Sequence, residues 1–323
     1  MGDLFDQVCT FSTLTLAAKK AFKGKQRKAK VMKCAFHQET EILRLQDQLL
    51  SGTYQPQPYR YFTVYEPKIR DIAAAHINDR IVHHAICHVL GDIFESVMLE
   101  NSYACRRGKG QHKAIQKAQA LSKKYAYVLK FDVRKYFASI DHDILLGILK
   151  QVIPDDALFN LCKIIIQYPL LLSTGEGKGL PIGNLTSQYY ANLYLNILDW
   201  YIAESLGETN CLRYMDDVLI FSDDKTTLWG YLEKIEAFLQ DKLTLKLKHS
   251  MTQVIPVSEG INYLGMRIFP NTIRLQHKSK SKFIRKMHQN KSRDSIAASV
   301  AHVTHANTLR LRQKVFSDSI VSG

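Results

Sequence analysis

Residues 211–222 read Cys-Leu-Arg-Tyr-Met-Asp-Asp-Val-Leu-Ile-Phe-Ser, two short apolar segments that meet at the acidic pair Asp216 and Asp217. This pattern predicts two strands joined by a tight turn that carries the carboxylates. Adjacent carboxylates beside apolar strands repel each other, and they cost stability unless a cation lies between them. A bound divalent metal ion removes that cost, so the segment is a candidate metal site.

A second predicted strand also ends on an acid, because Tyr-Val-Leu-Lys-Phe at 127–131 is followed by Asp132. Strand ends are where open α/β sheets usually place their chemistry. Three carboxylates from two neighbouring strands can hold two Mg²⁺ ions about 3.5 to 4 Å apart, the arrangement used for in-line phosphoryl displacement. The expected reaction is nucleotidyl transfer, with Asp132, Asp216 and Asp217 as its catalytic residues.

The composition indicates a polyanionic partner for a globular protein. Among 323 residues, 44 Lys and Arg exceed 30 Asp and Glu, which gives a formal net charge of +14. Nucleic acid is the first candidate for such a charge. The six cysteines include no Cys-x-x-Cys pair, and no apolar run reaches the length of about 18 residues that suggests a membrane helix. We therefore expect reduced thiols, no membrane partner and a cytoplasmic location.

The remaining pattern predicts mixed helices and strands. A hairpin is expected between 54 and 72, and it carries Lys68 and Arg70. Helices are expected at 73–98, 144–152, 187–205 and 225–243, a glycine-rich loop at 173–183 and short strands at 254–269. After Pro270 the composition becomes basic and helical, so we place a subdomain boundary there.

Four of these segments, in this order, resemble reverse transcriptases, and the likeness extends from about Tyr59 to Met266. The Tyr-Met-Asp-Asp turn resembles the metal-binding box of that family, and 130–137 resembles its other aspartate box. Gly-Leu-Pro-Ile-Gly-Asn-Leu-Thr-Ser-Gln at 179–188 resembles the loop and helix beneath the templating base pair, and Ile-Asn-Tyr-Leu-Gly at 261–265 resembles the primer grip.

The resemblance implies an α+β fold of the right-hand polymerase type with an antiparallel palm sheet. The implied fingers are 1–125 and 142–178, the palm is 126–141 and 179–269, and a short basic helical thumb is 270–323. We expect template RNA, a DNA or RNA primer and deoxynucleoside triphosphates as partners. Because the family's thumb is usually longer, we also expect that a small basic accessory protein assists the grip.

The resemblance also implies a role for each matched position. Asp132 and Asp216 would touch two Mg²⁺ ions, with Mn²⁺ as a substitute, and Asp217 would touch mainly the ion that activates the primer 3′-hydroxyl. Val133 would belong to the same metal site. The implied nucleotide-binding residues are Lys68, Arg70, Phe137, Ile182, Gly183 and Gln188, and the implied primer grip is Tyr263, Leu264 and Gly265.

Two of these positions have an alternative interpretation. Phe137 is expected to occupy the space that a ribose 2′-hydroxyl needs, and the less favoured alternative is simple core packing. Ile182 stands where accurate relatives carry a Gln that can hydrogen-bond near the incoming nucleotide, or it could simply pack against the following helix.

Ile182 and Gln188 also resemble the reverse transcriptases of diversity-generating retroelements, as do 65–70 and 257–265. In such systems a template-repeat RNA is copied with errors at adenines. Two alternative functions stay open. One is a phage-defence, retron-like or unassigned bacterial reverse transcriptase, and the other is a polymerase relic that binds RNA but has lost catalysis. The second rival is disfavoured because a relic has no reason to keep three repelling acids.

Overall fold

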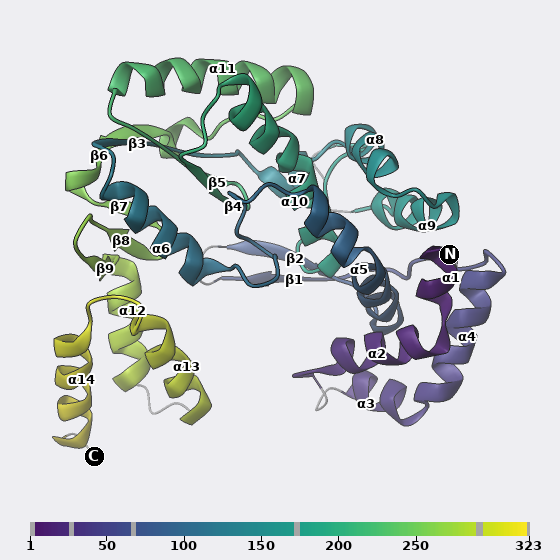
Figure 1. The fold of residues 1–323 in the computed structure, drawn as a ribbon. Helices are drawn as coiled ribbons and strands as arrows, with labels where there is room; N and C mark the ends of the chain where they lie inside the picture. The colour runs from purple at the N-terminus through teal and green to yellow at the C-terminus, as the bar shows by residue number, and fades with distance from the viewer. Residues whose placement is uncertain (1–3, 26–28, 66–68, 171–174, 289–292, 322–323) are drawn as a thin grey trace. The chain divides into compact units, whose positions relative to one another are not determined.

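The computed structural model describes residues 4–25, 29–65, 69–170, 175–288 and 293–321 (Figure 1). The chain divides into two compact units, each built from segments that are separate in sequence. Unit 1 comprises residues 1–99, 133–200 and 238–246, and unit 2 comprises 100–132, 201–237 and 247–323. Among the described helices, none is both long and apolar enough to cross a membrane.

The centre of unit 2 is a four-stranded antiparallel sheet in the order β4-β5-β3-β6. Both central strands are buried along their four inner residues, which explains why they read as continuous apolar runs. The predicted antiparallel sheet is thereby confirmed. The strands are β3 (Tyr127–Asp132), β4 (Cys211–Tyr214), β5 (Asp217–Ser222) and β6 (Gln253–Pro256).

A second, three-stranded sheet of unit 2 has the order β7-β8-β9. Its strands are β7 (Ile261–Tyr263), β8 (Met266–Ile268) and β9 (Ile273–Leu275). Helix α6 (Gln111–Ser122) packs on strands of both sheets, and its apolar face joins their common core (Figure 1). One core therefore holds the strand that ends on Asp132 and the hairpin of the predicted primer grip.

The basic C-terminal region begins with a strand rather than a helix. Strand β9 lies beyond Pro270 because Ile273 pairs with Ile268 and is buried in the sheet core. Three helices follow, and they share a small core made of Phe283, Met287, Val303 and Val315. They are α12 (His277–His288), α13 (Arg293–Val303) and α14 (Leu309–Val321).

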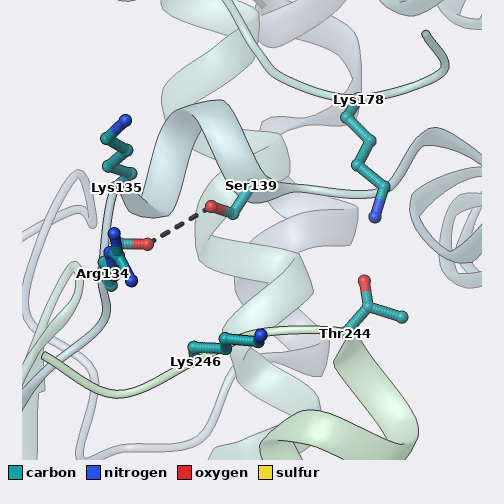
Figure 2. A pocket seen from close by; sticks show the side chains of 6 residues that line it. All are labelled: Arg134, Lys135, Ser139, Lys178, Thr244 and Lys246. Atoms are coloured by element: carbon teal, nitrogen blue, oxygen red, sulfur yellow. Dashed lines mark hydrogen bonds between the residues drawn. The ribbon is translucent and has the colours of Figure 1, made fainter. Parts of the chain in front are cut away.

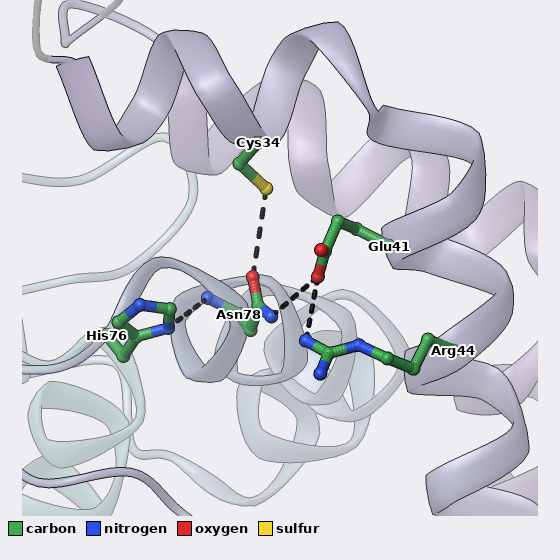
Figure 3. A network of polar contacts seen from close by, with 5 residues as sticks. All are labelled: Cys34, Glu41, Arg44, His76 and Asn78. Carbon is green, nitrogen blue, oxygen red and sulfur yellow. Dashed lines mark hydrogen bonds and ion pairs between the residues drawn. The ribbon is translucent and has the colours of Figure 1, made fainter.

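The first part of unit 1 is helical and surrounds α5 (Ile77–Val97), which contacts α1, α2 and α3 (Figure 1). A buried polar network ties α3 and α4 to the start of α5. Asn78 donates to Glu41 at 3.0 Å and accepts from the Cys34 thiol at 3.7 Å (Figure 3). The surrounding helices are α1 (Leu4–Cys9), α2 (Phe11–Phe22), α3 (Ala29–Phe36) and α4 (Gln38–Leu50).

Among its described residues, the rest of unit 1 adds a two-stranded hairpin and four helices. Asp141 caps the helix at 142–152 by accepting from the backbone amides of Asp143 and Ile144. The elements are β1 (Arg60–Val64), β2 (Arg70–Ala74), α7 (Tyr136–Ser139), α8 (His142–Val152), α9 (Asp156–Gln167) and α10 (Leu185–Trp200). Helix α11 (Lys225–Leu243) begins in unit 2 and ends in unit 1.

Candidate active site

The acidic pair lies at the turn between β4 and β5. Tyr214 pairs with Asp217 in the strand register, so Met215 and Asp216 form the turn. Met215 has a φ of 56°, a left-handed conformation that is uncommon for a residue other than glycine. Backbone strain of this kind collects at functional sites, where the surrounding structure holds it in place.

The strand register brings Asp132 directly opposite Asp217 on β3 and β5. Like charges at such positions destabilise an antiparallel pair. Burial, the charge of Asp132 and a side-chain hydrogen bond with Asp132 together raise the pKa of Asp216 to about 7. The three carboxylates therefore repel one another, and their hard oxygen donors are the kind that Mg²⁺ prefers. The donor set fits a divalent cation.

One positive charge does reach this cluster, from Lys130 on β3. Its side chain is only 6% exposed, and its Nζ lies 3.5 Å from Asp217 Oδ1. The same ammonium group donates to the Asn262 carbonyl and lies 5.9 Å from the centre of the Tyr263 ring. Within the described ranges, no three Asp, Glu, His or Cys side chains are already arranged to hold a metal ion. The sheet thus gathers the carboxylates without closing a chelate around one point.

Lys130 also connects the carboxylates to the hairpin at 261–268, which carries the predicted primer grip. Tyr263 is fully buried and supports this hairpin from inside. Leu264 and Gly265 form its turn with φ values of 48° and 81°, and both are partly exposed. Gln111 holds the turn by donating to the Leu264 carbonyl at 2.8 Å.

Arg213 is fully buried one residue before the Tyr-Met-Asp-Asp turn. Its Nη1 donates to the Met215 carbonyl at 3.1 Å, and its Nη2 donates to the Ser102 hydroxyl at 3.3 Å. Its own backbone amide donates to the Asn101 carbonyl at 2.8 Å. The guanidinium fork therefore fastens the strained turn to the neighbouring chain segment, and it brings a second cation to the acidic end of the hairpin.

We expect Arg213→Lys to lower the free energy of unfolding by about 1 to 3 kcal/mol, because a single ammonium group cannot replace both hydrogen bonds of the fork and leaves a buried acceptor unpaired. Urea unfolding of the metal-free protein measures this loss. Arg310→Lys is the control, since Arg310 is exposed. Equal stability of the two variants would contradict a clamping role for Arg213.

The predicted nucleotide-binding residues that the structure describes lie in unit 1. Arg70 is exposed at the start of β2, and Lys68 lies outside the described residues. The segment at 179–183 is hydrogen-bonded through its backbone to β2, which carries Arg70, and to α7, which carries Phe137. Ala73 of β2 donates its amide to the Ile182 carbonyl at 3.1 Å, and Leu180 donates to the Phe137 carbonyl at 2.8 Å.

Phe137 and Ile182 are both half-buried, so neither is enclosed in a core. Gln188 is half-buried on α10. Gly183 has a φ of 131°, and a Cβ there would lie 3.1 Å from the Ile72 side chain and 3.2 Å from the Ala73 carbonyl oxygen. Glycine is therefore required where this loop passes β2.

The three catalytic candidates belong to unit 2, whereas Val133, which was predicted only for the metal site, belongs to unit 1. The Val133 side chain is buried and apolar, so only its main-chain carbonyl could bind a metal ion.

Comparison with known proteins decides the family. Residues 65–268, more than half of the chain, match the family model described as "Reverse transcriptase (RNA-dependent DNA polymerase)". The chain belongs to the reverse transcriptase family. It is thus an RNA-directed DNA polymerase by family, and the carboxylate cluster lies within the matched range.

The similar proteins are distant in sequence. Protein YkfC of Escherichia coli is 27% identical over 71% of this chain and 71% of its own length. The group II intron-encoded protein LtrA of Lactococcus lactis is 26% identical over 51% of this chain but only 29% of its own length. The match therefore covers less than a third of the intron protein.

Solved telomerase structures confirm the α+β fold. A telomerase from Candida tropicalis, in complex with a TWJ fragment of telomeric RNA, has a TM-score of 0.56 at 11% identity and covers 88% of this chain and 59% of its own. A telomerase from Candida albicans has a TM-score of 0.53 at 9% identity, over 82% of this chain and 55% of its own.

Two residues of this reverse transcriptase site were missed by reasoning from sequence, namely Lys130 and Arg213. A signal for Lys130 was present, because a lysine two positions before Asp132 in an apolar strand must share a face with that acid. Arg213 gave no comparable signal, since its role depends on Ser102, a distant residue in the sequence.

Proposed function

We propose that this protein copies an RNA template into DNA by nucleotidyl transfer at Asp132, Asp216 and Asp217. One observation carries the proposal: the strand register that sets Asp132 opposite Asp217, beside the half-buried turn residue Asp216. Three repelling carboxylates at one end of a sheet cost stability unless a cation lies between them. They suit a site that binds cations and polarises phosphate.

Bound Mg²⁺ or Mn²⁺ ions supply the charge that activates the primer 3′-hydroxyl and stabilises the transferring phosphate. Asp132, Asp216 and Asp217 would hold these ions, with the Val133 carbonyl as a further ligand. Lys130 would position Asp217 through their ion pair. Lys68 and Arg70 would bind the triphosphate, and the turn at 263–265 would orient the primer end.

Primer extension by the purified protein tests the proposal, with an RNA template, a DNA primer, all four deoxynucleotides and Mg²⁺. We expect extension that stops when the metal is chelated and resumes when it is restored. A protein that binds the RNA but extends no primer with either Mg²⁺ or Mn²⁺ would instead be a polymerase relic. Binding of RNA is measured separately by titration at low salt.

Phe137 is proposed to exclude the ribose 2′-hydroxyl of an incoming nucleotide. Its half-buried ring supports this role over core packing, because a core residue would be enclosed. We expect Phe137→Val to raise ribonucleotide incorporation relative to deoxynucleotide incorporation by roughly 10-fold or more, since a steric contact of this kind contributes on the order of 1 to 3 kcal/mol to selectivity. Single-nucleotide incorporation assays measure it, and Tyr136→Phe is a control within the same helix. If an active Phe137→Val variant has unchanged sugar selectivity, Phe137 is a packing residue and does not exclude the 2′-hydroxyl.

We also propose that the enzyme is of the diversity-generating retroelement type and introduces errors at template adenines. The support is the resemblance at 65–70, 182–188 and 257–265, and the apolar Ile182 in a loop that contacts β2. A small basic accessory protein would assist it. Inspection of the flanking DNA tests this type, because a template repeat beside a matching variable repeat is expected.

Ile182→Gln tests the fidelity proposal directly. A polar contact that forms only around a correct base pair contributes on the order of 1 to 3 kcal/mol, so restoring it should lower errors opposite adenine by roughly 10-fold. Sequencing of cDNA from one template measures the error at each base. Ile182→Leu is the apolar control and should behave like the parent protein. If adenine errors are equal in all three proteins, Ile182 is a packing residue.

A further inference from the structure

Lys130 is a buried cation that joins two separate parts of the candidate site. Its Nζ lies 3.5 Å from Oδ1 of Asp217, the first residue of β5. The same ammonium group donates to the Asn262 carbonyl and lies 5.9 Å from the centre of the Tyr263 ring, and both of these residues belong to β7. One side chain therefore connects the hairpin of the predicted primer grip to a predicted catalytic carboxylate.

Burial distinguishes Lys130 from the clustered cations of unit 1. Four of those cations line one cavity, namely Arg134, Lys135, Lys178 and Lys246 (Figure 2). The side chain of Lys178 is 39% exposed and lies 3.8 Å from Asp141, whereas that of Lys130 is only 6% exposed. A buried ammonium group has lost its hydration and depends on its neighbours for compensation. The contacts of Lys130 therefore fix its position, while an exposed lysine keeps more rotamer freedom.

The hairpin that receives Lys130 is itself fastened at its turn. Gln111 of α6 donates to the Leu264 carbonyl at 2.8 Å. The backbone amide of Gln276 donates to the Gly265 carbonyl at 3.1 Å. These two hydrogen bonds tie the turn to a helix on one side and to the start of the basic C-terminal helices on the other. The hairpin is therefore a fixed support for the buried ammonium group.

We propose that Lys130 is a positioning residue that couples the primer-grip hairpin to Asp217. The inference rests on the proposed polymerase function, and it adds the residue that holds the carboxylate in place relative to the primer end. Lys130 acts through Asp217 and does not touch the substrate. Misplacement of a reacting group by about 1 Å can cost roughly 100-fold in rate, so a tether of this kind can control the chemical step.

Replacement of Lys130 by methionine separates positioning from folding, because methionine keeps an unbranched apolar side chain and removes the charge. We expect Lys130→Met to slow primer extension by roughly 10- to 100-fold. The variant should bind Mg²⁺ at least as tightly as the parent protein, because a cation that competes for Asp217 is gone. A merely structural role would weaken both properties together. Single-nucleotide extension at saturating Mg²⁺ and calorimetric titration of the full chain with Mg²⁺ measure them.

Lys109→Met is the matched control. Lys109 makes the same three kinds of contact, because it pairs with the Glu100 carboxylate at 2.9 Å, donates to the Glu100 carbonyl at 2.6 Å and lies 5.3 Å from the centre of the Tyr103 ring. Its side chain is 13% exposed, and its partner is not one of the predicted catalytic acids. This variant should extend primers at the parent rate.

The outcomes distinguish this inference from the proposed function. Equal extension rates in Lys130→Met and Lys109→Met would overturn the positioning role, as would a loss of Mg²⁺ affinity that accompanies the loss of rate. A parent protein that extends no primer would overturn the proposed function instead. If urea unfolding shows that Lys130→Met is not folded, Lys130→Gln takes its place, because it retains a hydrogen-bond donor without the charge.

A double-mutant cycle tests the coupling itself. Gln111→Ala removes the hydrogen bond to the Leu264 carbonyl and loosens the hairpin turn. If the hairpin acts through Lys130, the variant that combines Gln111→Ala with Lys130→Met should extend primers roughly 3-fold or more faster than the product of the two single effects predicts. Single effects that simply multiply would show that the hairpin and Asp217 act independently, and would overturn the coupling.

Discussion

Asp132→Asn and Asp216→Asn are each expected to reduce DNA synthesis by roughly 100-fold or more, while RNA binding stays nearly unchanged. An amide keeps the shape of the side chain but removes the charge that holds a metal ion, and metal ions contribute several kcal/mol to phosphoryl-transfer transition states. RNA binding depends instead on the basic surface of a chain with a net charge of +14. Primer extension and RNA titration measure the two properties separately.

Asp223→Asn is the matched control for these variants. Asp223 is an exposed acid just beyond the opposite end of β5, and its Oδ1 accepts from the Ala126 amide, which an asparagine oxygen can also do. This variant should retain full activity. If Asp132→Asn or Asp216→Asn kept more than a few per cent of activity in the same assay, the catalytic role of that residue would be wrong.

The second large effect concerns pH, because burial and the neighbouring Asp132 raise the pKa of Asp216 to about 7. A proton and a metal ion compete for this carboxylate. A group with this pKa is roughly one-tenth ionised at pH 6 and nine-tenths ionised at pH 8, so Mg²⁺ affinity should be roughly tenfold lower at pH 6. Titration of the protein with Mg²⁺ at both values measures the change. Affinity that is independent of pH would contradict the protonated state of Asp216.

The stability of the metal-free protein should change in the opposite direction. The pKa of Asp216 is raised in the folded protein above its ordinary value of 3.8, so the folded state holds its proton more tightly. The resulting stabilisation is present below about pH 4 and is lost as pH rises through about 7. We expect the thermal unfolding midpoint to fall between pH 5 and pH 8, and Asp216→Asn to remove this part of the decline.

Much of the acidic hairpin at 211–222 followed from local pattern. Apolar runs of strand length, interrupted only at an acidic pair, predict a hairpin because the strands need burial and the carboxylates need solvent or a cation. The same logic identified the strand that ends on Asp132. The order of the segments then indicated reverse transcriptase, which the family match confirms. The subdomain boundaries and the individual site roles stay predictions.

Local pattern was less informative where pairing partners are distant in sequence. Pro270 suggested the end of the sheet, yet β9 continues beyond it because Ile273 finds its partner in Ile268. The sequence also placed a single helix at 187–205, whereas the structure has α10 ending at Trp200 and a π-helical turn at 201–205. Element types were therefore easier to predict than element ends.

The sequence by itself determined the acids, the strands that carry them and the polymerase family, since these depend on residue type and short-range periodicity. Only the tertiary structure decided that Asp132 faces Asp217, that Lys130 pairs with Asp217 and that Arg213 fastens the turn. Charges from remote segments become neighbours only when burial of the apolar strands and helices brings those segments together, and no local pattern encodes that proximity.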